Sequence, residues 1–381
     1  MDLKLATISS VPSRGAAVQG TFPGRAHSAV DSARLVDYEP CMGSLRTEPS
    51  APVLGFPTRR RFMLDVLIDE QDRLELLRAE ARRGLTRRPK ELPPKWFYDA
   101  RGSALFDAIT GLPEYYLTRR ERAILRVRAA EIAAITGART LVELGSGTSD
   151  KTRILIDALD AAGTLESFVP FDVCRPALED AGAALLDEYP RLEVHAVVGD
   201  FDLHLGAIAH EGPTLVAFLG STIGNFPAPA RADLLGELRR MLGAGGFFLV
   251  GTDLVKDPAR LDAAYNDSRG ITAAFNRNVL RVLNRDLDAD FAEERFEHVA
   301  AFDPELELVD IRLRSRVAQM VHVRALDLNV HFDAGEEMRT EISTKFQRAG
   351  LERELAAAGF EAAGWWTDRA GDFALSLWRV D

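Results

Sequence analysis

Apolar and polar positions along the middle of the chain follow the pattern of an α/β protein. Short apolar runs that end in a polar residue or a glycine are separated by stretches in which apolar residues recur at helical spacing. Because strands that alternate with helices build a parallel sheet covered on both faces, the pattern predicts a doubly wound α/β domain. The expected strands cover residues 140–144, 167–171, 194–198, 215–219 and 247–250, and the expected helices cover 149–161, 175–187, 203–210 and 228–242.

The alternation changes after residue 257. Residues 258–295 have mostly helical spacing, whereas residues 296–321 alternate in the manner of an antiparallel hairpin. A helix near 347–358 and two strands at about 361–366 and 373–379 then complete the first pattern. A Rossmann-like, mostly parallel sheet that ends in a C-terminal antiparallel hairpin is the usual architecture of class I methyltransferases, and we expect this fold class.

The first 62 residues differ from the rest in composition. They carry eight basic and five acidic residues, a net charge of +3 against −14 for the remainder, and six of the 18 prolines, with no sustained periodicity. Such a segment cannot bury a core, so residues 1–62 are predicted to be a disordered N-terminal extension. A transit-like tail is the alternative.

Met63 marks a boundary in the pattern. Apolar residues at helical spacing predict an amphipathic helix from Met63 to about Arg83, which Gly84 would end. One hypothesis is therefore that Met63 is the start of the folded, and even of the translated, protein.

A length of 381 residues is enough for two domains. Residues 63–119 and the insertion 256–344 are predicted to pack together as an α+β substrate-binding domain. Residues 120–255 and 345–381 are predicted to form the methyltransferase domain.

Composition and charge narrow the class of protein. The chain is 46% hydrophobic and 28% charged, and it contains neither an apolar run of the ~18 residues that span a membrane nor a secretory signal. Its two cysteines cannot build a disulfide framework, and its seven histidines lack metal-binding spacing. A net charge of −11 argues against nucleic-acid binding. We expect a cytoplasmic, metal-free monomer that acts on a small molecule, with no membrane or nucleic-acid partner.

A glycine turn follows the first expected strand. Residues 140–144 lead into Gly145-Ser-Gly147, which predicts a tight turn into a helix, where α/β domains bind nucleotide-like cofactors. A dinucleotide site would have a third glycine at position 150, where this chain has Asp150, whose charge would repel a pyrophosphate. The turn therefore favours S-adenosylmethionine over a nicotinamide cofactor.

Polar residues also end the next two strands. Asp172 follows the second strand, where it can accept hydrogen bonds from ribose hydroxyls, and Asp200 follows the third, where it can accept from the adenine amino group. Phe201 is placed to cover the base, and Lys151 is placed to neutralise the methionine carboxylate. Because ligands of open α/β sheets bind beyond the carboxyl ends of the strands, these residues predict a cofactor site.

The loop after the fourth strand carries Asn225 between a glycine and an aromatic residue. Its amide oxygen can accept a hydrogen bond from an amine, and its NH2 group can donate to a carboxylate. Because this loop faces the transferred methyl group in the expected fold, Asn225 is a candidate for substrate binding. A turn asparagine without a ligand is the alternative.

Motifs spread over residues 63–381 carry a family resemblance. They are Pro94-Lys-Trp-Phe-Tyr98-Asp, Pro113-Glu-Tyr115-Tyr, Leu141-Val-Glu-Leu-Gly-Ser-Gly-Thr-Ser, Phe171-Asp172, Gly199-Asp200-Phe201, Phe218-Leu-Gly-Ser-Thr-Ile-Gly-Asn225, Gly251-Thr-Asp-Leu-Val-Lys-Asp257, Ala264-Tyr265, Ala274-Phe-Asn-Arg-Asn278, Thr340-Glu341-Ile-Ser343 and Trp365-Trp-Thr-Asp. Together they resemble the histidine-specific Nα-methyltransferases of ergothioneine biosynthesis. The resemblance implies S-adenosylmethionine-dependent trimethylation of the α-amino group of L-histidine, which gives hercynine.

The resemblance also implies site residues. Those that match the family's cofactor contacts are Gly145, Lys151, Asp172, Asp200 and Phe201, and those that match its substrate contacts are Tyr115, Asn225, Tyr265, Glu341 and Ser343. In the family, the equivalents of Asn225 and Tyr265 address the amino-acid carboxylate and amine, and the glutamate and serine read the imidazole. Tyr98 and Phe106 would form the pocket wall near the amine, which Asn225 and Tyr98 would orient. No residue is assigned as a general base.

The spacing of Glu341 and Ser343 agrees with that role, because side chains two residues apart in an extended segment project from one face. A carboxylate can accept the single N–H of a neutral imidazole, and the hydroxyl of Ser343 or Tyr115 can serve the other nitrogen. An indole would leave part of this set unpaired, at a cost on the order of 1–3 kcal/mol.

Three alternatives stay open from the sequence. The chain could methylate another amino acid or a tryptophan-derived amine, although the Glu341 and Ser343 pair argues against this. It could also be a cofactor-binding regulatory subunit without turnover. A nicotinamide-dependent oxidoreductase is the third alternative, which the glycine turn disfavours.

Overall fold

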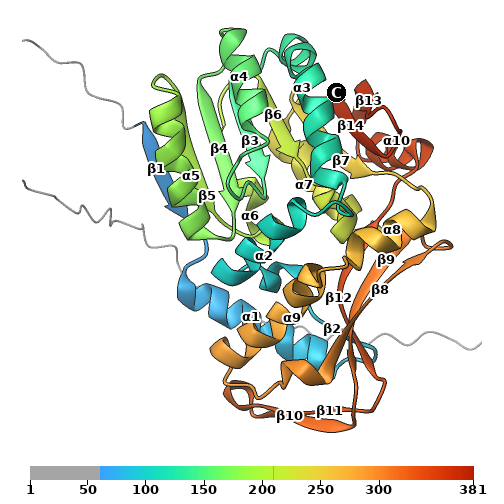
Figure 1. Cartoon of the computed structure of the whole chain (residues 1–381). Coiled ribbons are helices and arrows are strands. Elements are labelled where there is room, and N and C mark those ends of the chain that lie inside the picture. Colours follow the sequence, from blue (N-terminus) through green and yellow to red (C-terminus); the bar gives the residue numbers. More distant parts are fainter. Residues whose placement is uncertain (1–60, 209) are drawn as a thin grey trace, which may run out of the picture. The chain divides into compact units, whose positions relative to one another are not determined.

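An eight-stranded sheet is the largest element of the computed structural model, which describes residues 61–208 and 210–381 (Figure 1). Its strands lie in the order β1-β5-β4-β3-β6-β7-β14-β13. Neighbours among the first six strands pair in parallel, whereas β14 pairs antiparallel with both β7 and β13. This topology confirms the doubly wound sheet with a C-terminal antiparallel hairpin. In sheet order the strands are β1 Phe62–Val66, β5 Glu193–Val198, β4 Ser167–Asp172, β3 Thr140–Leu144, β6 Thr214–Phe218, β7 Phe247–Asp253, β14 Phe373–Val380 and β13 Phe360–Thr367.

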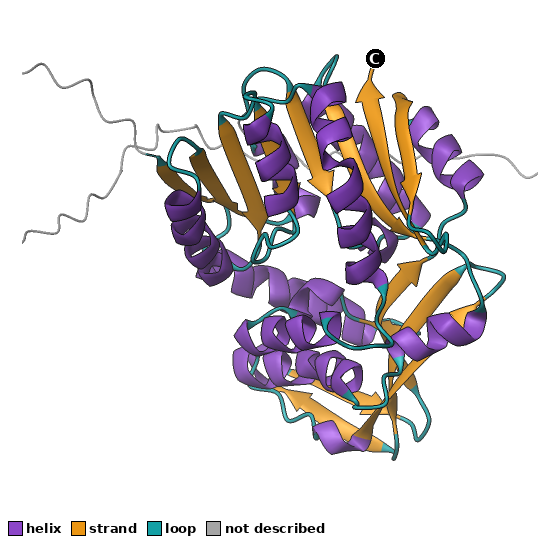
Figure 2. Ribbon diagram, turned by 45° about the horizontal axis from the view of Figure 1, so that its top comes forward, coloured by secondary structure: helices purple, strands orange, loops and turns teal. Residues whose placement is uncertain are grey.

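Helices cover both faces of this sheet (Figure 2). Leu141 and Leu215 share a hydrophobic core with helices α3 and α4, whereas the adjacent Val142 and Val216 share a core with α7 and α10. Since alternate residues are buried on opposite faces, the parallel strands are continuously apolar. The helices of this part are α3 Leu117–Thr136, α4 Arg153–Ala161, α5 Arg175–Glu188, α6 Phe201–His204, α7 Ala228–Leu242 and α10 Arg348–Ala357, with 3-10 turns η2 Leu205–Ala207 and η3 Thr222–Asn225.

A four-stranded sheet with the order β2-β12-β9-β8 organises the other elements. The hairpin expected within 296–321 is present as β8 and β9, and helix α9 packs against α2 and β8. The elements are α1 Glu70–Thr86, β2 Lys90–Glu91, η1 Pro94–Phe97, α2 Ala100–Thr110, α8 Pro258–Tyr265, α9 Ile271–Asp286, η4 Glu293–Arg295, β8 Phe296–Asp303, β9 Leu308–Ser315, β10 Gln319–Val323, η5 Arg324–Leu326, β11 Leu328–Phe332 and β12 Glu337–Thr344.

Contacts between residues join the described part of the chain, residues 61–208 and 210–381, into one compact unit. The division of this unit into a methyltransferase domain and a substrate-binding domain stays a prediction. None of the helices in the described part of the chain is both long enough and apolar enough to cross a bilayer.

The helix expected from Met63 to Arg83 is wrong at its start. Met63 lies in β1, which pairs in parallel with β5, and α1 begins only at Glu70. Asp69 sets this start, because its side chain accepts a hydrogen bond of 2.9 Å from the N–H of Asp72 and thereby caps the helix. A short run of apolar residues fits a strand and a helix equally well. Here the run forms a strand because it can pair with the edge of β5.

Gly84 does not end α1, which continues to Thr86. A Cβ atom at Gly84 would lie 1.9 Å from the carbonyl oxygen of Glu91. The glycine is therefore needed for the close approach of helix α1 and strand β2.

The folded part of the chain begins before Met63. The carbonyl oxygen of Arg61 accepts a hydrogen bond of 2.7 Å from the N–H of Val194, at the start of the pairing between β1 and β5. The hypothesis that Met63 starts the folded protein is therefore wrong. Residues 1–60, most of the predicted extension, lie outside the described residues.

Candidate active site

The glycine turn after β3 is bonded to the end of β4. Gly145 and Gly147 have φ angles of 68° and 49°, a left-handed conformation that glycine adopts readily. The N–H of Gly147 donates to Oδ2 of Asp172 over 2.9 Å, and the N–H of Cys174 donates to Oδ1 over 2.9 Å. Burial raises the pKa of Asp172, and these N–H groups oppose the rise. The structure thus brings Gly145 and Asp172 to two adjoining strand ends.

The same turn has features that fit a bound cofactor. The hydroxyl of Ser146 is buried and has no hydrogen-bond partner among the described residues. Because buried polar groups are normally paired, this hydroxyl is available to a polar group of a ligand. A Cβ atom at Gly145 would lie 3.4 Å from the Phe201 ring, so the glycine keeps backbone accessible beside that ring.

Asp200 and Phe201 lie at the end of β5. Oδ1 of Asp200 accepts a hydrogen bond of 3.0 Å from the N–H of Asp202, and Oδ2 lies 2.6 Å from Nζ of Lys95, which also reaches Glu80 at 2.8 Å. Burial lowers the pKa of Lys95, but the charges of Asp200 and Glu80 outweigh burial and raise it. The Lys95 ammonium therefore orients the carboxylate that is predicted to bind the adenine amino group.

A cleft of about 770 Å³ opens beside these residues. Its volume lies in the usual range of small-molecule sites, about 300–1,000 Å³. Thr148 after β3, Cys174 after β4 and Asp200 after β5 line it, together with Lys95 and Tyr98. The cleft therefore lies at the carboxyl ends of three neighbouring parallel strands, where the sequence predicts the cofactor.

Lys151 pairs with a carboxylate from another segment. Its Nζ lies 2.5 Å from Oε2 of Glu121, a fully buried residue of α3. Glu121 also accepts hydrogen bonds of 2.8 and 3.0 Å from the N–H of Gly220 in the loop after β6. A Cβ atom at Gly251 would lie 2.0 Å from Oε1 of Glu121, so β7 leaves space for this carboxylate. A contact between Lys151 and the methionine carboxylate stays a prediction.

A second, smaller pocket is lined by all five residues predicted to bind the substrate. These are Tyr115, Asn225, Tyr265, Glu341 and Ser343, and the expected wall residues Tyr98 and Phe106 line the same pocket. Tyr98 also lines the cofactor cleft, so the two cavities meet at its side chain. Adjoining cavities of this kind can hold a methyl donor and its acceptor close together.

Aromatic rings form one wall of the substrate pocket. The Tyr98 ring lies 5.7 Å from Phe106 and 5.3 Å from Phe275, and the Tyr115 ring lies 6.3 Å from Tyr265. Burial raises the pKa of Tyr98, Tyr115 and Tyr265 well above the usual value of 10.0. These phenols are neutral near pH 7, so they can donate hydrogen bonds but do not act as anionic bases.

Glu341 and Ser343 lie on β12, and the pairing of this strand with β9 shifts register between Arg339 and Glu341. Loss of solvent raises the pKa of Glu341 to about 7, and the charge of Lys345 and a hydrogen bond with Asn225 oppose the rise. Glu341 and Asn225 are therefore neighbours in the pocket, although 116 positions separate them in the sequence.

Three further charged residues of the site, Lys345, Asp253 and Glu121, have no role predicted from the sequence. Lys345 and Asp253 are buried behind the pocket, with Nζ 3.0 Å from Oδ2. The sequence does contain a pattern for two of them. Asp253 follows a strand, as Asp172 and Asp200 do, and Lys345 lies two residues after Ser343, the spacing that also separates Ser343 from Glu341. Glu121 gave no signal, since its arginine-rich surroundings are typical of an exposed helix face.

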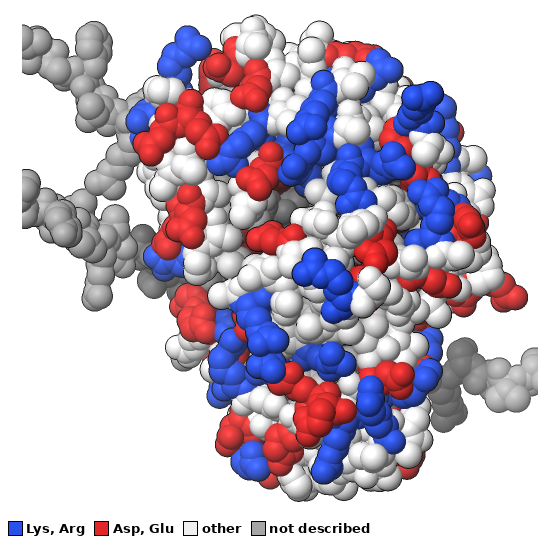
Figure 3. All heavy atoms as spheres, in the orientation of Figure 1, with Lys and Arg blue, Asp and Glu red and all other residues white. Residues whose placement is uncertain are grey.

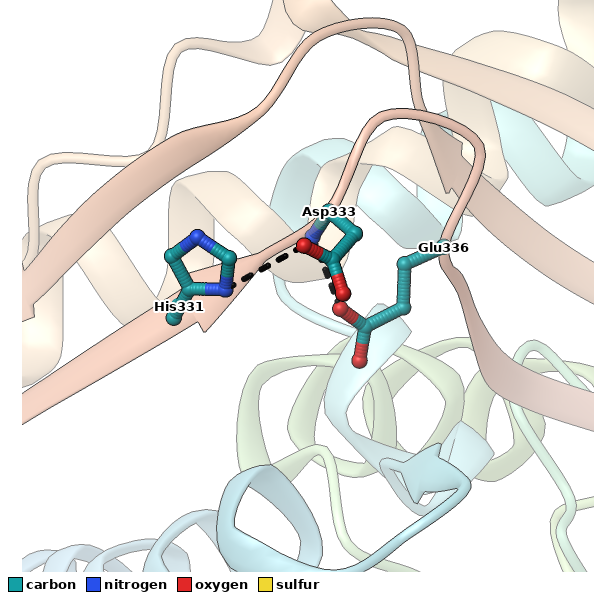
Figure 4. Close-up of side chains that lie close together, drawn as sticks. All are labelled: His331, Asp333 and Glu336. Atoms are coloured by element: carbon teal, nitrogen blue, oxygen red, sulfur yellow. Dashed lines mark hydrogen bonds and ion pairs between the residues drawn. The ribbon is translucent and has the colours of Figure 1, made fainter.

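Away from both cavities, one group of potential metal ligands occurs in the described part of the chain. His331, Asp333 and Glu336 gather where β11 turns into β12 (Figure 4). Nδ1 of His331 lies 3.7 Å from Oδ1 of Asp333, and Oε2 of Glu336 accepts a hydrogen bond of 2.9 Å from the N–H of Asp333. Glu336 is also paired with Lys90. These contacts explain the group as an ion-paired turn.

The parallel sheet with an antiparallel end is the fold expected for a class I methyltransferase. Its glycine turn and strand-end acids lie at a cleft that adjoins a small pocket. This fold and these two cavities together define methyl transfer as the chemistry of the site. The protein is a class I S-adenosylmethionine-dependent methyltransferase.

Comparison with known proteins gives the family. The sequence profile of the histidine-specific, S-adenosylmethionine-dependent methyltransferases matches residues 77–380, and the chain belongs to this family. The histidine N-alpha-methyltransferase of Mycolicibacterium smegmatis is 58% identical over 303 residues, which are 80% of this chain and 94% of that protein. The protein of the same name from Mycobacterium tuberculosis is 54% identical over 301 residues, 79% of this chain and 94% of that protein. Ergothioneine biosynthesis protein 1 of Neurospora crassa is 32% identical over 300 residues, 73% of this chain and 32% of that protein.

Proposed function

We propose that the protein transfers three methyl groups from S-adenosylmethionine to the α-amino group of L-histidine, giving hercynine in the first step of ergothioneine biosynthesis. The observation that carries this proposal is the position of Glu341, Ser343 and Asn225 in one pocket that meets the cofactor cleft at Tyr98. Family membership and the names of the mycobacterial relatives support the same reaction.

Glu341 and Ser343 can recognise an imidazole. The ionised carboxylate of Glu341 accepts the ring N–H, and a hydroxyl from Ser343 serves the second nitrogen. In the free pocket the Glu341 carboxyl is hydrogen-bonded to Asn225. Substrate binding would exchange this contact for two others, with Glu341 on the ring and Asn225 on the backbone of the amino acid.

S-adenosylmethionine supplies an electrophilic methyl group, which a neutral amine attacks in line as the bond from carbon to sulfur breaks. Positive charge moves from sulfur to nitrogen in this step, so strong acid-base catalysis is not required. Asn225 and the Tyr98 hydroxyl would orient the amine, and the buried aromatic wall would exclude water. The first two transfers each release a proton, whereas the third leaves a fixed cation.

The residues that would bind S-adenosylmethionine lie on the other side of the transferred methyl group from the histidine pocket. Asp172 would accept from the ribose hydroxyls, and Asp200, oriented by Lys95, would accept from the adenine amino group. Gly145 leaves backbone accessible for the methionine part, Phe201 would cover the base, and Lys151 would complement the carboxylate. Thr148 and Cys174 are among the other residues that line the cleft.

We also propose that the enzyme is a monomer and that it works in the cytoplasm. On the face shown in Figure 3, basic side chains are interspersed with acidic ones. Such a face does not present the continuous basic surface that binds a nucleic-acid backbone. Sedimentation at two protein concentrations tests the monomer.

Replacing Glu341 tests the substrate assignment. The Glu341→Ala variant and the unaltered protein are each given histidine and tryptophan as methyl acceptors, and the rates of S-adenosylmethionine consumption are compared. The proposal predicts that the preference for histidine falls by roughly tenfold to a hundredfold, the range of an unpaired buried polar group. An unchanged preference would remove Glu341 as the residue that recognises the imidazole.

A further inference from the structure

Lys345 is completely buried behind the substrate pocket and uses all of its hydrogen-bonding capacity there. Its Nζ lies 3.0 Å from Oδ2 of Asp253, 2.8 Å from the hydroxyl of Tyr265 and 2.8 Å from the hydroxyl of Ser343. An ammonium group has three N–H donors and no acceptor. Both hydroxyl oxygens therefore accept a hydrogen bond from Lys345.

Charged neighbours favour the ammonium form of Lys345, because the carboxylates of Asp253 and Glu341 oppose the lowering of its pKa by burial. Oδ1 of Asp253 lies 2.6 Å from Nζ of Lys256, so one carboxylate lies between two lysines. The hydroxyl of Tyr116 also donates to Asp253, over 3.0 Å. Glu341 is the second carboxylate that interacts with Lys345, and the two lysines and two acids together balance in charge. Buried charges persist in proteins when they are paired in this way.

The hydroxyls of Tyr265 and Ser343 are also bonded to each other, with their oxygens 2.8 Å apart. A phenol is a stronger donor than an alkyl hydroxyl, and the alkyl oxygen is the better acceptor, which favours Tyr265 as the donor and Ser343 as the acceptor. The oxygen of Ser343 then accepts from both Lys345 and Tyr265, and both of its lone pairs are used. Only the hydrogen of Ser343 remains for a ligand.

We propose that Lys345 is a positioning residue that makes Ser343 an obligatory hydrogen-bond donor to the substrate. The pocket then demands a ring with an acceptor nitrogen on the side of Ser343 and an N–H group on the side of Glu341. This inference rests on the proposed function, since it concerns how the imidazole of histidine is selected. A ring that offers an N–H or a carbon to Ser343 leaves this hydroxyl unpaired.

The test uses the Lys345→Met variant, because methionine has a similar length but no donor. Both proteins are given histidine and a pyrrolylalanine, an analogue that keeps an N–H but lacks the acceptor nitrogen. In the unaltered protein the analogue loses on the order of tenfold in kcat/KM, mainly through KM. In the variant Ser343 is free to rotate, and the ratio between histidine and the analogue falls to a few-fold.

Lys256→Met is the matched control. It removes the other lysine from the same Asp253, but Lys256 has no contact with Tyr265 or Ser343 among its hydrogen bonds. A general loss of structure would lower the rates for both substrates in both variants. The inference predicts that only Lys345→Met changes the ratio between the substrates, and an equal change in both variants would overturn it.

A measurement on the unaltered protein covers the case in which Lys345→Met does not fold. If the protein methylates the pyrrolylalanine as efficiently as histidine, the pocket does not demand an acceptor nitrogen and the inference is wrong. If instead histidine is not methylated at all, the proposed function fails. The two failures are therefore distinguishable in one assay.

Discussion

The ammonium of Lys151 lies 2.5 Å from the carboxylate of Glu121, and this contact joins helix α3 to the segment that follows the glycine turn. The same carboxylate accepts from the N–H of Gly220 in the loop that precedes Asn225. Glu121 thus links the cofactor side of the site to the loop on the substrate side, from a helix whose sequence shows no functional motif.

Replacing Glu121 with alanine should destabilise the fold and weaken cofactor binding together. The change leaves the N–H of Gly220 without its partner and Lys151 without its counter-ion. Because the carboxylate is fully buried, the free energy of unfolding should fall by about 3 kcal/mol. Urea denaturation measures this change, and Arg126→Ala, at an exposed position of the same helix, is the control that should change stability by less than about 0.5 kcal/mol.

Lys95→Met should raise the KM for S-adenosylmethionine and leave the KM for histidine nearly unchanged. The variant removes the ammonium that orients Asp200 but no residue of the substrate pocket. We expect an increase on the order of tenfold, the usual effect of a lost charged hydrogen bond. Arg83→Met is the control, because Arg83 lies 3.9 Å from Glu80, the other partner of Lys95, yet is mostly exposed. Equal effects of the two variants would contradict the role of Lys95.

Histidine binding should strengthen between about pH 6 and pH 8, since the pKa of Glu341 is raised to about 7 and its ionised form accepts an imidazole N–H more strongly than its protonated form does. The KM for histidine should therefore fall over this interval, and Glu341→Gln should flatten the part of the profile that belongs to this group. Glu337→Gln on the same strand is the control. Burial alone would raise the pKa of Glu337, but Arg312 and Arg314 outweigh burial and lower it, so Glu337 is already ionised over this pH interval.

The same carboxyl should make folding less favourable as pH rises. Its pKa in the folded protein lies above the usual 4.5, so the unfolded chain releases the proton first. The contribution of Glu341 to stability is fully present below about pH 4.5 and is lost as pH rises through about 7. Denaturation of the unaltered protein and of Glu341→Gln at several pH values should show the variant gaining relative stability toward pH 8; a constant difference would contradict the raised pKa.

Two glycines in helices should respond to alanine with opposite signs. Gly236 in α7 has open space where a Cβ atom would lie, so Gly236→Ala should stabilise the protein by about 0.5–1 kcal/mol. Gly84 in α1 approaches the backbone of Glu91, so Gly84→Ala should destabilise it by more than about 1 kcal/mol. Thermal denaturation of the pair checks both signs.

Much of the fold and of the cofactor side follows from the sequence. Asp172 and Asp200 could be placed because buried strands are readable as apolar runs, and the carboxyl ends of parallel strands meet at one edge. The sequence wrongly predicts a helix at Met63, because the five residues of this edge strand contain too few alternations to distinguish a strand period from a helix period.

The rest of the site depends on contacts that no local pattern encodes. Lys95 meets Asp200 across 105 positions, and Lys345 meets Tyr265 across 80. Each residue alone has the properties of a solvated charge, and only the folded chain shows its partner. Family resemblance alone points to Glu341 and Tyr265 as partners in one site, since their spacing in the sequence does not bring them together.

Mass spectrometry of the reaction product tests the central claim most directly. Purified protein is incubated with L-histidine and S-adenosylmethionine, and the product mass and the amount of donor consumed are measured together. The proposed function predicts a product heavier than histidine by three methylene increments, with three donor molecules used for each histidine. Binding of S-adenosylmethionine without consumption, or methylation of tryptophan in place of histidine, would contradict it.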